Sequence, residues 1–256
     1  MAKKSNINIP TIAVIRLIVF LFIGSILFWI YSRTVDFLTN ADIFDIKEVM
    51  VDQSISFIDT QPLVALKGQN IFSVDLEKIH QHISNRYPQI SQLRITRQFP
   101  DTVKVLAKKR DVLLQIQTGN KFLIVDTEGV TMFYTAVPLA YPRVHGIPLQ
   151  GHKVTLGTVS SIKELSFAVR LLTLLKSHPH TSRLKVISLD AGNLSKLELM
   201  VMPNIKIIID QEDLPQKVDM LELLLQNGKI NWNNVKYVDI RFKEPIINES
   251  IPQEEK

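Results

Sequence analysis

An apolar segment close to the start of the chain limits its fold more than any other feature. Residues 17–31 carry no charge, and the apolar segment as a whole runs for about 20 residues, from Ile12 to Tyr31. As an α-helix, this length spans ~30 Å, the hydrocarbon thickness of a bilayer. Arg16 lies near one end, where a long side chain can reach the headgroups, and Trp29 lies near the other, where interfacial aromatic residues are common. We expect a transmembrane helix at residues 12–31.

The charges on either side of this segment predict its orientation. Lys3 and Lys4 precede it, whereas Arg33 and then Asp36, Asp42 and Asp45 follow it. The positive-inside rule therefore keeps the tail, residues 1–11, in the cytoplasm and places most of the chain outside the inner membrane. A cleaved signal peptide is the alternative, but the apolar run is long for one and no small-x-small cleavage site follows closely. A buried core helix would have a polar face, which this segment lacks.

Composition excludes several kinds of site. The chain of 256 residues has no cysteine, which rules out disulfides, thiolate metal ligands and thiol nucleophiles. Its net charge of +5 is only mildly basic and is not gathered with aromatic residues, so we expect no nucleic-acid binding. The patterns G-x-S-x-G, G-x-G-x-x-G and the P-loop do not occur. We expect neither an enzyme nor a cofactor.

One Ser-x-x-Lys spacing, Ser160 to Lys163, resembles that of penicillin-recognising serine enzymes. The SDN and KTG elements that those enzymes also need are absent from the sequence. Ser161 and Glu164 instead fit a capping box at the start of a helix.

Two pairs of histidines are candidate metal ligands. His80 and His82 are two residues apart on a predicted helix and point to nearly opposite faces, so they cannot hold one ion. His178 and His180 flank a proline in a predicted loop and could bind a metal adventitiously, but no carboxylate lies near them in the sequence. We expect no functional metal.

The part of the chain after the anchor changes its periodicity in a defined order. Residues 32–42 form a polar connector, and residues 44–51 have strand character. A short helix is expected from Thr60 to about Gly68, and a second helix begins at Ser73 or Asp75. Two strands follow at residues 92–99 and 102–109, separated by a Pro-Asp turn. The pattern predicts a β-α-α-β-β domain at residues 43–112.

This order, immediately outside a single anchor, resembles the POTRA (polypeptide-transport-associated) domain. Residues 68–116 are similar to the POTRA domain of the FtsQ/DivIB cell-division proteins. The similarity is carried by Gly68-x-Asn70-Ile71-Phe72, Tyr87-Pro88, Arg97-x-Phe99-Pro100-x-Thr102 and Lys109-Arg110.

Residues 113–247 resemble the β domain of the same family. A strand–turn–strand unit at residues 122–133 has Asp126 and Gly129 at its bend, and a helix begins at Ser161. Paired strands, a second helix and a terminal strand at residues 235–242 follow, and residues 248–256 form a flexible acidic tail. The fold class is therefore predicted as α+β: a transmembrane helix, a POTRA domain, and a mixed β-sheet domain with helices.

The resemblance implies a non-enzymatic scaffold of the bacterial divisome, enriched at the division septum. It implies binding of the FtsL–FtsB pair, with FtsK and the septal peptidoglycan synthase complex as further partners. The final strand is expected to be an open edge to which a partner adds a strand. Phe242 matches the family best, although Pro245 interrupts the edge. The predicted partner-binding residues are Tyr237, Asp239, Arg241, Phe242, Glu244, Ile246 and Ile247.

Basic residues in the two POTRA strands suggest a second surface. Arg94, Arg97, Lys104 and Lys108 form either a solvated sheet face or a docking face for an acidic partner or anionic headgroups. Two alternatives to the scaffold are a POTRA-containing translocation or secretion component and an anchored hydrolase. The first usually has tandem POTRA domains or a barrel, and the second needs catalytic groups that we do not find.

Overall fold

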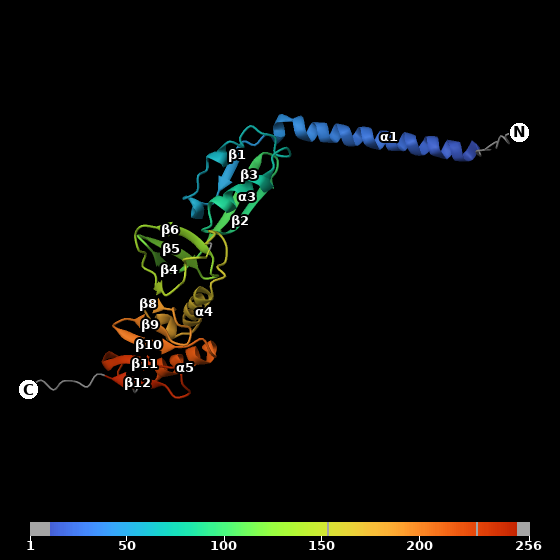
Figure 1. The fold of residues 1–256 in the computed structure, drawn as a ribbon. Coiled ribbons are helices and arrows are strands. Elements are labelled where there is room, and N and C mark those ends of the chain that lie inside the picture. Colours follow the sequence, from blue (N-terminus) through green and yellow to red (C-terminus); the bar gives the residue numbers. More distant parts are fainter. Residues whose placement is uncertain (1–10, 153, 229, 250–256) are drawn as a thin grey trace, which may run out of the picture. The chain divides into compact units, whose positions relative to one another are not determined.

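The computed structural model describes residues 11–152, 154–228 and 230–249 (Figure 1). The described chain divides into two compact units. The first contains the chain up to His82 together with Leu93–Ala107, and the second contains Ile83–Gln92 together with the chain from Lys108 onward.

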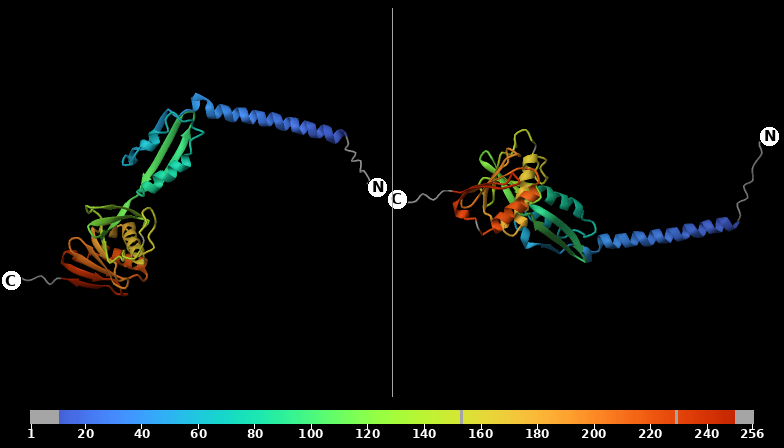
Figure 2. Two further views of the ribbon diagram at one scale, coloured as in Figure 1. Left: turned by 45° about the horizontal axis from the view of Figure 1, so that its top comes forward. Right: turned by 90° about the horizontal axis from the view of Figure 1, so that it is seen from below.

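The apolar segment forms one continuous helix, α1 (Thr11–Asn40), as Figure 2 shows. Its 30 residues correspond to ~45 Å, which is longer than the hydrocarbon core of a bilayer. Helix Val14–Asn40 is long and apolar enough to cross a membrane, and none of its most apolar window is buried. The connector predicted at residues 32–42 is therefore wrong in conformation, because α1 continues to Asn40 and a 3-10 turn, η1 (Asp42–Phe44), follows.

The first folded domain has the predicted β-α-α-β-β order. Its three strands pair in the order β1-β3-β2, with β1 parallel to β3. Asp75 Oδ1 accepts a hydrogen bond from Lys78 N–H (3.2 Å), as expected of a residue that caps the second helix. The first strand is shorter than predicted. The elements are β1 (Glu48–Val51), η2 (Gln53–Ile55), α2 (Gln61–Val64), α3 (Leu76–Arg86), β2 (Ile90–Gln98) and β3 (Thr102–Lys109).

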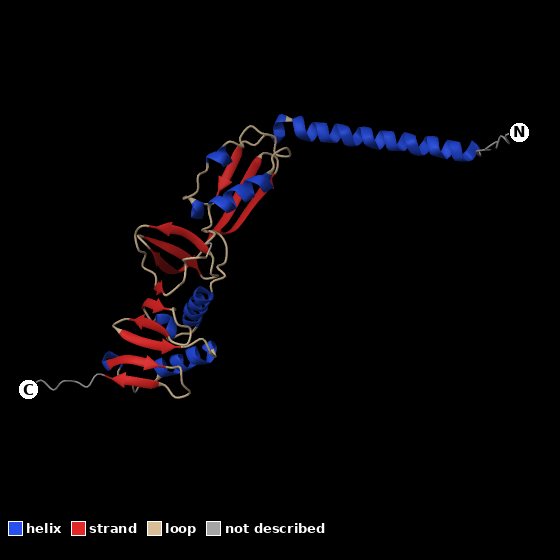
Figure 3. Ribbon diagram, in the orientation of Figure 1, coloured by secondary structure: helices blue, strands red, loops and turns tan. Residues whose placement is uncertain are grey.

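The second domain is built on a nine-stranded sheet in the order β12-β11-β10-β9-β8-β7-β4-β5-β6. Figure 3 shows the strands in red and the helices in blue. The bend predicted at Asp126 and Gly129 joins β5 to β6, where Gly129 has φ +82°. The strands are β4 (Val112–Thr118), β5 (Lys121–Asp126), β6 (Thr131–Thr135), β7 (Arg143–His145), β8 (Val186–Asp190), β9 (Leu197–Val201), β10 (Ile205–Ile209), β11 (Val235–Asp239) and β12 (Ile246–Glu249). The helical elements are α4 (Lys163–Ser177), η3 (Thr181–Arg183), α5 (Leu214–Gln226) and η4 (Trp232–Asn234).

Two crossover connections explain why both helices lie on one face of this sheet. Strand β7 is parallel to β8 and β10 is parallel to β11, and parallel neighbours need a crossover, here α4 and α5. Strand β10 has the same direction as β8, because two antiparallel pairings separate them. Each crossover leads to the neighbouring strand on the β12 side, from β7 to β8 and from β10 to β11. Right-handed connections therefore place both helices on the same side of the sheet. The helices and the sheet share one core, which includes Leu165, Leu172, Val218 and Leu221.

The start of α4 differs from its prediction. The helix begins at Lys163 rather than Ser161, its N-cap is Ile162, and no side chain caps it. Ser160 Oγ accepts a hydrogen bond from Ile162 N–H (3.3 Å) just before the helix. The predicted capping box between Ser161 and Glu164 is therefore wrong.

Candidate partner-binding edge

The C-terminal end of the large sheet is strand β12, and not β11 as predicted. Strand β11 pairs on one side with β10 and on the other with β12, an antiparallel pairing that places Val238 opposite Ile247 and Asp239 opposite Ile246. In the part of the chain that the structure describes, β12 ends the sheet. Strand β12 (Ile246–Glu249) thus includes Asn248 and Glu249, which were predicted to begin a flexible tail, and an added strand would pair with β12.

Asp239 and Arg241 fix the turn that leads from β11 to β12. Asp239 is buried, and it accepts hydrogen bonds from the Arg241 backbone N–H (3.1 Å), Nε (3.0 Å) and NH2 (2.7 Å). Burial raises the pKa of Asp239, but the bonds from Arg241 outweigh it, so the pKa of this carboxyl group lies below its ordinary value. The pair therefore holds the turn, with Asp239 buried and the Arg241 side chain partly exposed.

Phe242 and Ile246 are the predicted site residues that expose apolar surface. Phe242 is 52% exposed and Ile246 is 49% exposed, and Glu244 between them is also exposed. The guanidinium carbon of Arg241 lies 5.4 Å from the centre of the Phe242 ring, which holds the ring at the start of the turn. Ile247 is half-buried and packs against the core.

The helix-free face of the sheet beside this edge is polar. Tyr237 lies opposite Lys206, and Lys206 Nζ contacts Glu198 at 2.9 Å. Lys196 Nζ contacts the other oxygen of the same carboxylate at 2.7 Å. The bonds from Lys196 and Lys206 lower the pKa of Glu198. The exposed apolar side chains at the edge therefore adjoin a face with paired charges.

Of the four residues predicted to form a basic face on the POTRA strands, Arg97 does not lie on that face. Arg94 and Lys104 are exposed on the side opposite the buried Val103 and Val105. Arg97 points the other way: its Nε donates to the carbonyl oxygen of Ile71 and its NH2 to that of Val74, both at 2.7 Å. Lys108, near the end of β3, is exposed. The assignment of Arg97 to a docking face is wrong, because its donors satisfy backbone carbonyls.

Arg110, which sequence analysis named in the Lys109-Arg110 match, has a structural role. It donates to Pro88 O (3.1 Å), to Asp126 Oδ2 (2.7 Å) and to Glu128 Oε2 (2.8 Å). Its side chain is 15% exposed and that of Asp126 only 2%, so this is a largely buried ion pair. Asp126 also accepts hydrogen bonds from the N–H groups of Glu128 and Val130 within the β5–β6 bend.

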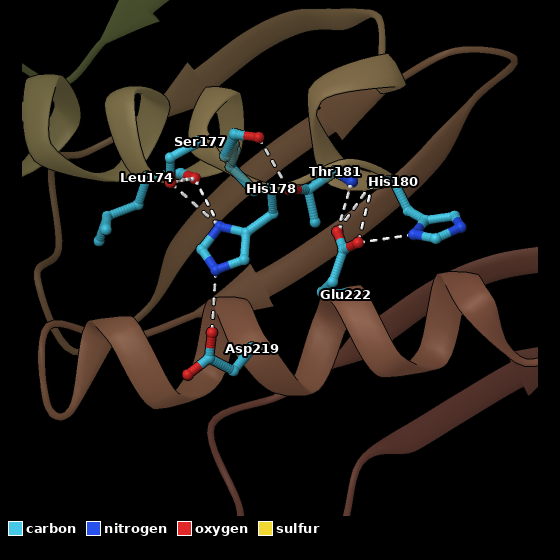
Figure 4. A network of polar contacts seen from close by, with 8 residues as sticks. Leu174, Ser177, His178, His180, Thr181, Asp219 and Glu222 are labelled. Carbon is cyan, nitrogen blue, oxygen red and sulfur yellow. Dashed lines mark hydrogen bonds and ion pairs between the residues drawn. The ribbon is translucent and has the colours of Figure 1, made fainter.

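His178 lies in a polar network between the loop after α4 and helix α5 (Figure 4). Its Nδ1 faces the Leu174 carbonyl oxygen (3.0 Å) and its Nε2 faces Asp219 Oδ1 (2.9 Å). Both partners only accept, so both ring nitrogens donate when the imidazole is protonated. The contact with Leu174, reinforced by Asp219, therefore raises the pKa of His178. Ser177 Oγ donates to the same Leu174 oxygen (2.7 Å) and lies 3.1 Å from His178 Nδ1.

His180 lies in the same network and contacts a different carboxylate. Its Nδ1 lies 2.6 Å from Glu222 Oε1, and Glu222 also accepts from the backbone N–H groups of His180 and Thr181 (Figure 4). Burial opposes ionisation, but these bonds lower the pKa of Glu222 to about 2. Sequence reasoning missed both carboxylates because they lie about 40 residues further along the chain. The two histidines join the loop to α5 through separate pairs.

The amino-acid sequence of the chain is similar to those of known proteins. An FtsQ-type POTRA domain model matches residues 44–110. The cell division protein DivIB of Clostridium acetobutylicum is 24% identical over 209 residues, which are 78% of this chain and 80% of that protein. The cell division protein FtsQ of Rickettsia conorii is 22% identical over 182 residues, 71% of this chain and 62% of that protein. FtsQ of Streptomyces griseus is 25% identical over 83 residues, 32% of this chain and 38% of that protein.

One apolar N-terminal helix, an FtsQ-type POTRA domain and a mixed β-sheet domain fit a single-pass membrane protein of the POTRA class. The FtsQ-type POTRA match and the similarity to proteins named DivIB and FtsQ support a place in the FtsQ/DivIB family and a role in cell division. The predicted fold class is confirmed.

Proposed function

We propose that this protein is a non-enzymatic scaffold that joins early and late division proteins at the septum. Helix α1 holds it in the bacterial inner membrane with the N-terminus in the cytoplasm, and the folded domains lie outside. The charges flanking α1 support this orientation. The FtsL–FtsB pair binds to the β domain by strand addition, and FtsK and the septal peptidoglycan synthase complex are further partners.

The observation that best supports this proposal is the C-terminal edge of the large sheet. Strand β12 ends the described sheet and offers backbone N–H and C=O groups to an extended segment. Phe242 and Ile246 project apolar surface beside this strand. A partner segment would gain main-chain hydrogen bonds from the edge and apolar contacts from these two side chains. Pro245 precedes the strand, so strand pairing starts at Ile246.

The experiment changes the exposed aromatic residue and measures recovery of FtsB. We expect Phe242→Ala and Phe242→Lys to abolish co-purification of FtsB with the full-length protein from membranes. Thermal melting should stay nearly unchanged, because Phe242 is 52% exposed and its contact with Arg241 is worth only about 0.5–1 kcal/mol.

A matched control is Leu223→Lys on α5, which changes an apolar side chain that is 65% exposed on the same domain. This variant should retain FtsB. Normal recovery of FtsB with both Phe242 variants rules the site out, and equal loss with Leu223→Lys shows that the effect is not specific to the edge.

A further inference from the structure

Four phenylalanine rings form a continuous row from the end of α1 into the POTRA domain. The ring centres of Phe37 and Phe44 are 6.0 Å apart and those of Phe44 and Phe72 are 5.1 Å apart, both edge to face. Phe72 stacks on Phe99, again at 5.1 Å. Such pairs add about 0.5–1.5 kcal/mol each beyond the area they bury. The row therefore couples the last turns of the anchor helix to the end of strand β2.

Hydrogen bonds fix the same junction. Asn70 Nδ2 donates to the Leu38 carbonyl oxygen at 2.9 Å, and Ile71 N–H donates to the Phe44 carbonyl oxygen at 2.8 Å. Ala41 is the one residue between α1 and η1, and its N–H still donates to the Phe37 carbonyl oxygen (3.1 Å). The chain thus passes from the anchor into the POTRA domain without a flexible linker.

Three apolar side chains at this junction are exposed. Phe37 is 62% exposed, Phe99 is 57% exposed and Ile43 is 55% exposed. We call these three residues the aromatic rim. Phe37 lies in α1 and Ile43 in the η1 turn that follows it, so exposed apolar side chains continue past Tyr31, where the predicted membrane segment ends. Phe99 follows β2 and reaches this junction through its stacking on Phe72.

The length of α1 sets the height of the rim above the hydrocarbon. Phe37 is six residues after Tyr31, the end of the apolar segment, which corresponds to ~9 Å along the helix axis. The headgroup zone of one leaflet is about 5–8 Å thick. A helical side chain leans toward the N-terminus of its helix, which brings the Phe37 ring back toward the bilayer. The Phe37 ring therefore lies at the depth of the headgroups, and Phe99 is linked to it through the rings of Phe44 and Phe72.

We propose that the aromatic rim inserts into the headgroup zone of the outer leaflet, so that the POTRA domain has a second lipid contact beside α1. This inference rests on the proposed membrane anchoring of α1. Asp36 and Asp42 flank the rim and do not attract anionic lipids. The contact is therefore apolar, binds zwitterionic lipid and is insensitive to salt.

The absence of cysteine from the sequence permits a direct test with single nitroxide labels. The full-length protein is placed in nanodiscs of phosphatidylcholine and labelled at Ile43→Cys. The matched control is Val64→Cys on α2, which is 54% exposed in the same unit, and Phe22→Cys reports on the middle of α1. Electron paramagnetic resonance compares collisions of each label with oxygen, which enters lipid, and with a water-soluble nickel chelate.

We expect the ratio of oxygen to nickel collisions to be several-fold higher at position 43 than at position 64. Adding Phe37→Ser and Phe99→Ser should lower the ratio at position 43 to that of the control. If the label at position 22 is exposed to lipid but the ratios of oxygen to nickel collisions at positions 43 and 64 are equal, the rim contact is overturned and the anchoring is not. A water-exposed label at 22 overturns the anchoring and the rim contact with it. Dipolar broadening between labels at 43 means that a second copy covers the rim, which also overturns the proposal.

Discussion

Gln115 is a fully buried polar side chain in the middle of an apolar strand, and its replacement by leucine tests how the segment 136–142 is held against β4. Its Nε2 donates to the carbonyl oxygens of Leu139 (2.6 Å) and Tyr141 (2.7 Å). Its Oε1 accepts from the Leu139 N–H (2.9 Å). One side chain therefore makes three hydrogen bonds to the backbone of a segment more than 20 residues away.

Leucine has nearly the volume of glutamine, so Gln115→Leu removes these bonds without leaving a cavity. Each bond contributes about 1 kcal/mol, and a buried group left without a partner costs about 1–3 kcal/mol. The segment 136–142 is largely exposed, so water can replace part of what is lost. We expect Gln115→Leu to lower the free energy of unfolding by about 3 kcal/mol. In a unit of this size that corresponds to a fall in Tm of roughly 6–12 °C.

The assay is urea unfolding of the full-length protein in detergent, followed by the fluorescence of Trp232. The chain has two tryptophans, so a Trp29→Phe background leaves one reporter, in the second unit. Gln117→Leu on the same strand is the control, because Gln117 is exposed and should change stability by less than about 0.5 kcal/mol. If Gln115→Leu lowers the free energy of unfolding no more than Gln117→Leu does, the three hydrogen bonds do not stabilise the protein as expected.

Three further predictions concern ionised groups of the same unit. Arg110→Met leaves the buried carboxylate of Asp126 without its cation and should lower the free energy of unfolding by about 3 kcal/mol in the urea assay. The folded pKa of His178 lies above its ordinary value of 6.5, chiefly through the Leu174 carbonyl, so its contribution to stability is full below pH 6.5 and is lost as pH rises through the folded pKa. His178→Gln should remove this alkaline decline in Tm. The pKa of Glu222 is about 2 against an ordinary 4.5, so its contribution is full above pH 4.5 and is lost as pH falls toward 2. Glu222→Gln should flatten the acid limb of the same profile.

Exposed residues of the same types serve as controls for these three changes. Arg170→Met, His145→Gln and Glu244→Gln each alter an exposed side chain of the second unit and should leave the corresponding measurement nearly unchanged. If the free energies of unfolding of Arg110→Met and Arg170→Met differ by less than about 1 kcal/mol, the predicted contribution of the buried ion pair is contradicted. A pH profile of His178→Gln or Glu222→Gln that overlays that of the unmodified protein contradicts the respective titration.

The order of elements could be predicted from the sequence because each depends on local patterns. An apolar run without charges can only be a helix in lipid or in a core, and α1 follows from it. Alternation of apolar residues predicted β2 and β3, and the Asp126–Gly129 bend followed from a carboxylate that binds nearby N–H groups and a glycine that adopts positive φ.

Tertiary structure alone decided which strand ends the described sheet and what the polar residues do. The short stretch Ile246–Glu249 is a strand because its backbone pairs with that of β11. Nothing local in those four residues requires a strand. The direction of Arg97 and the carboxylate partners of His178 and His180 depend on segments distant in sequence. Periodicity is local and records which face of an element is apolar, whereas pairing depends on which elements meet in space.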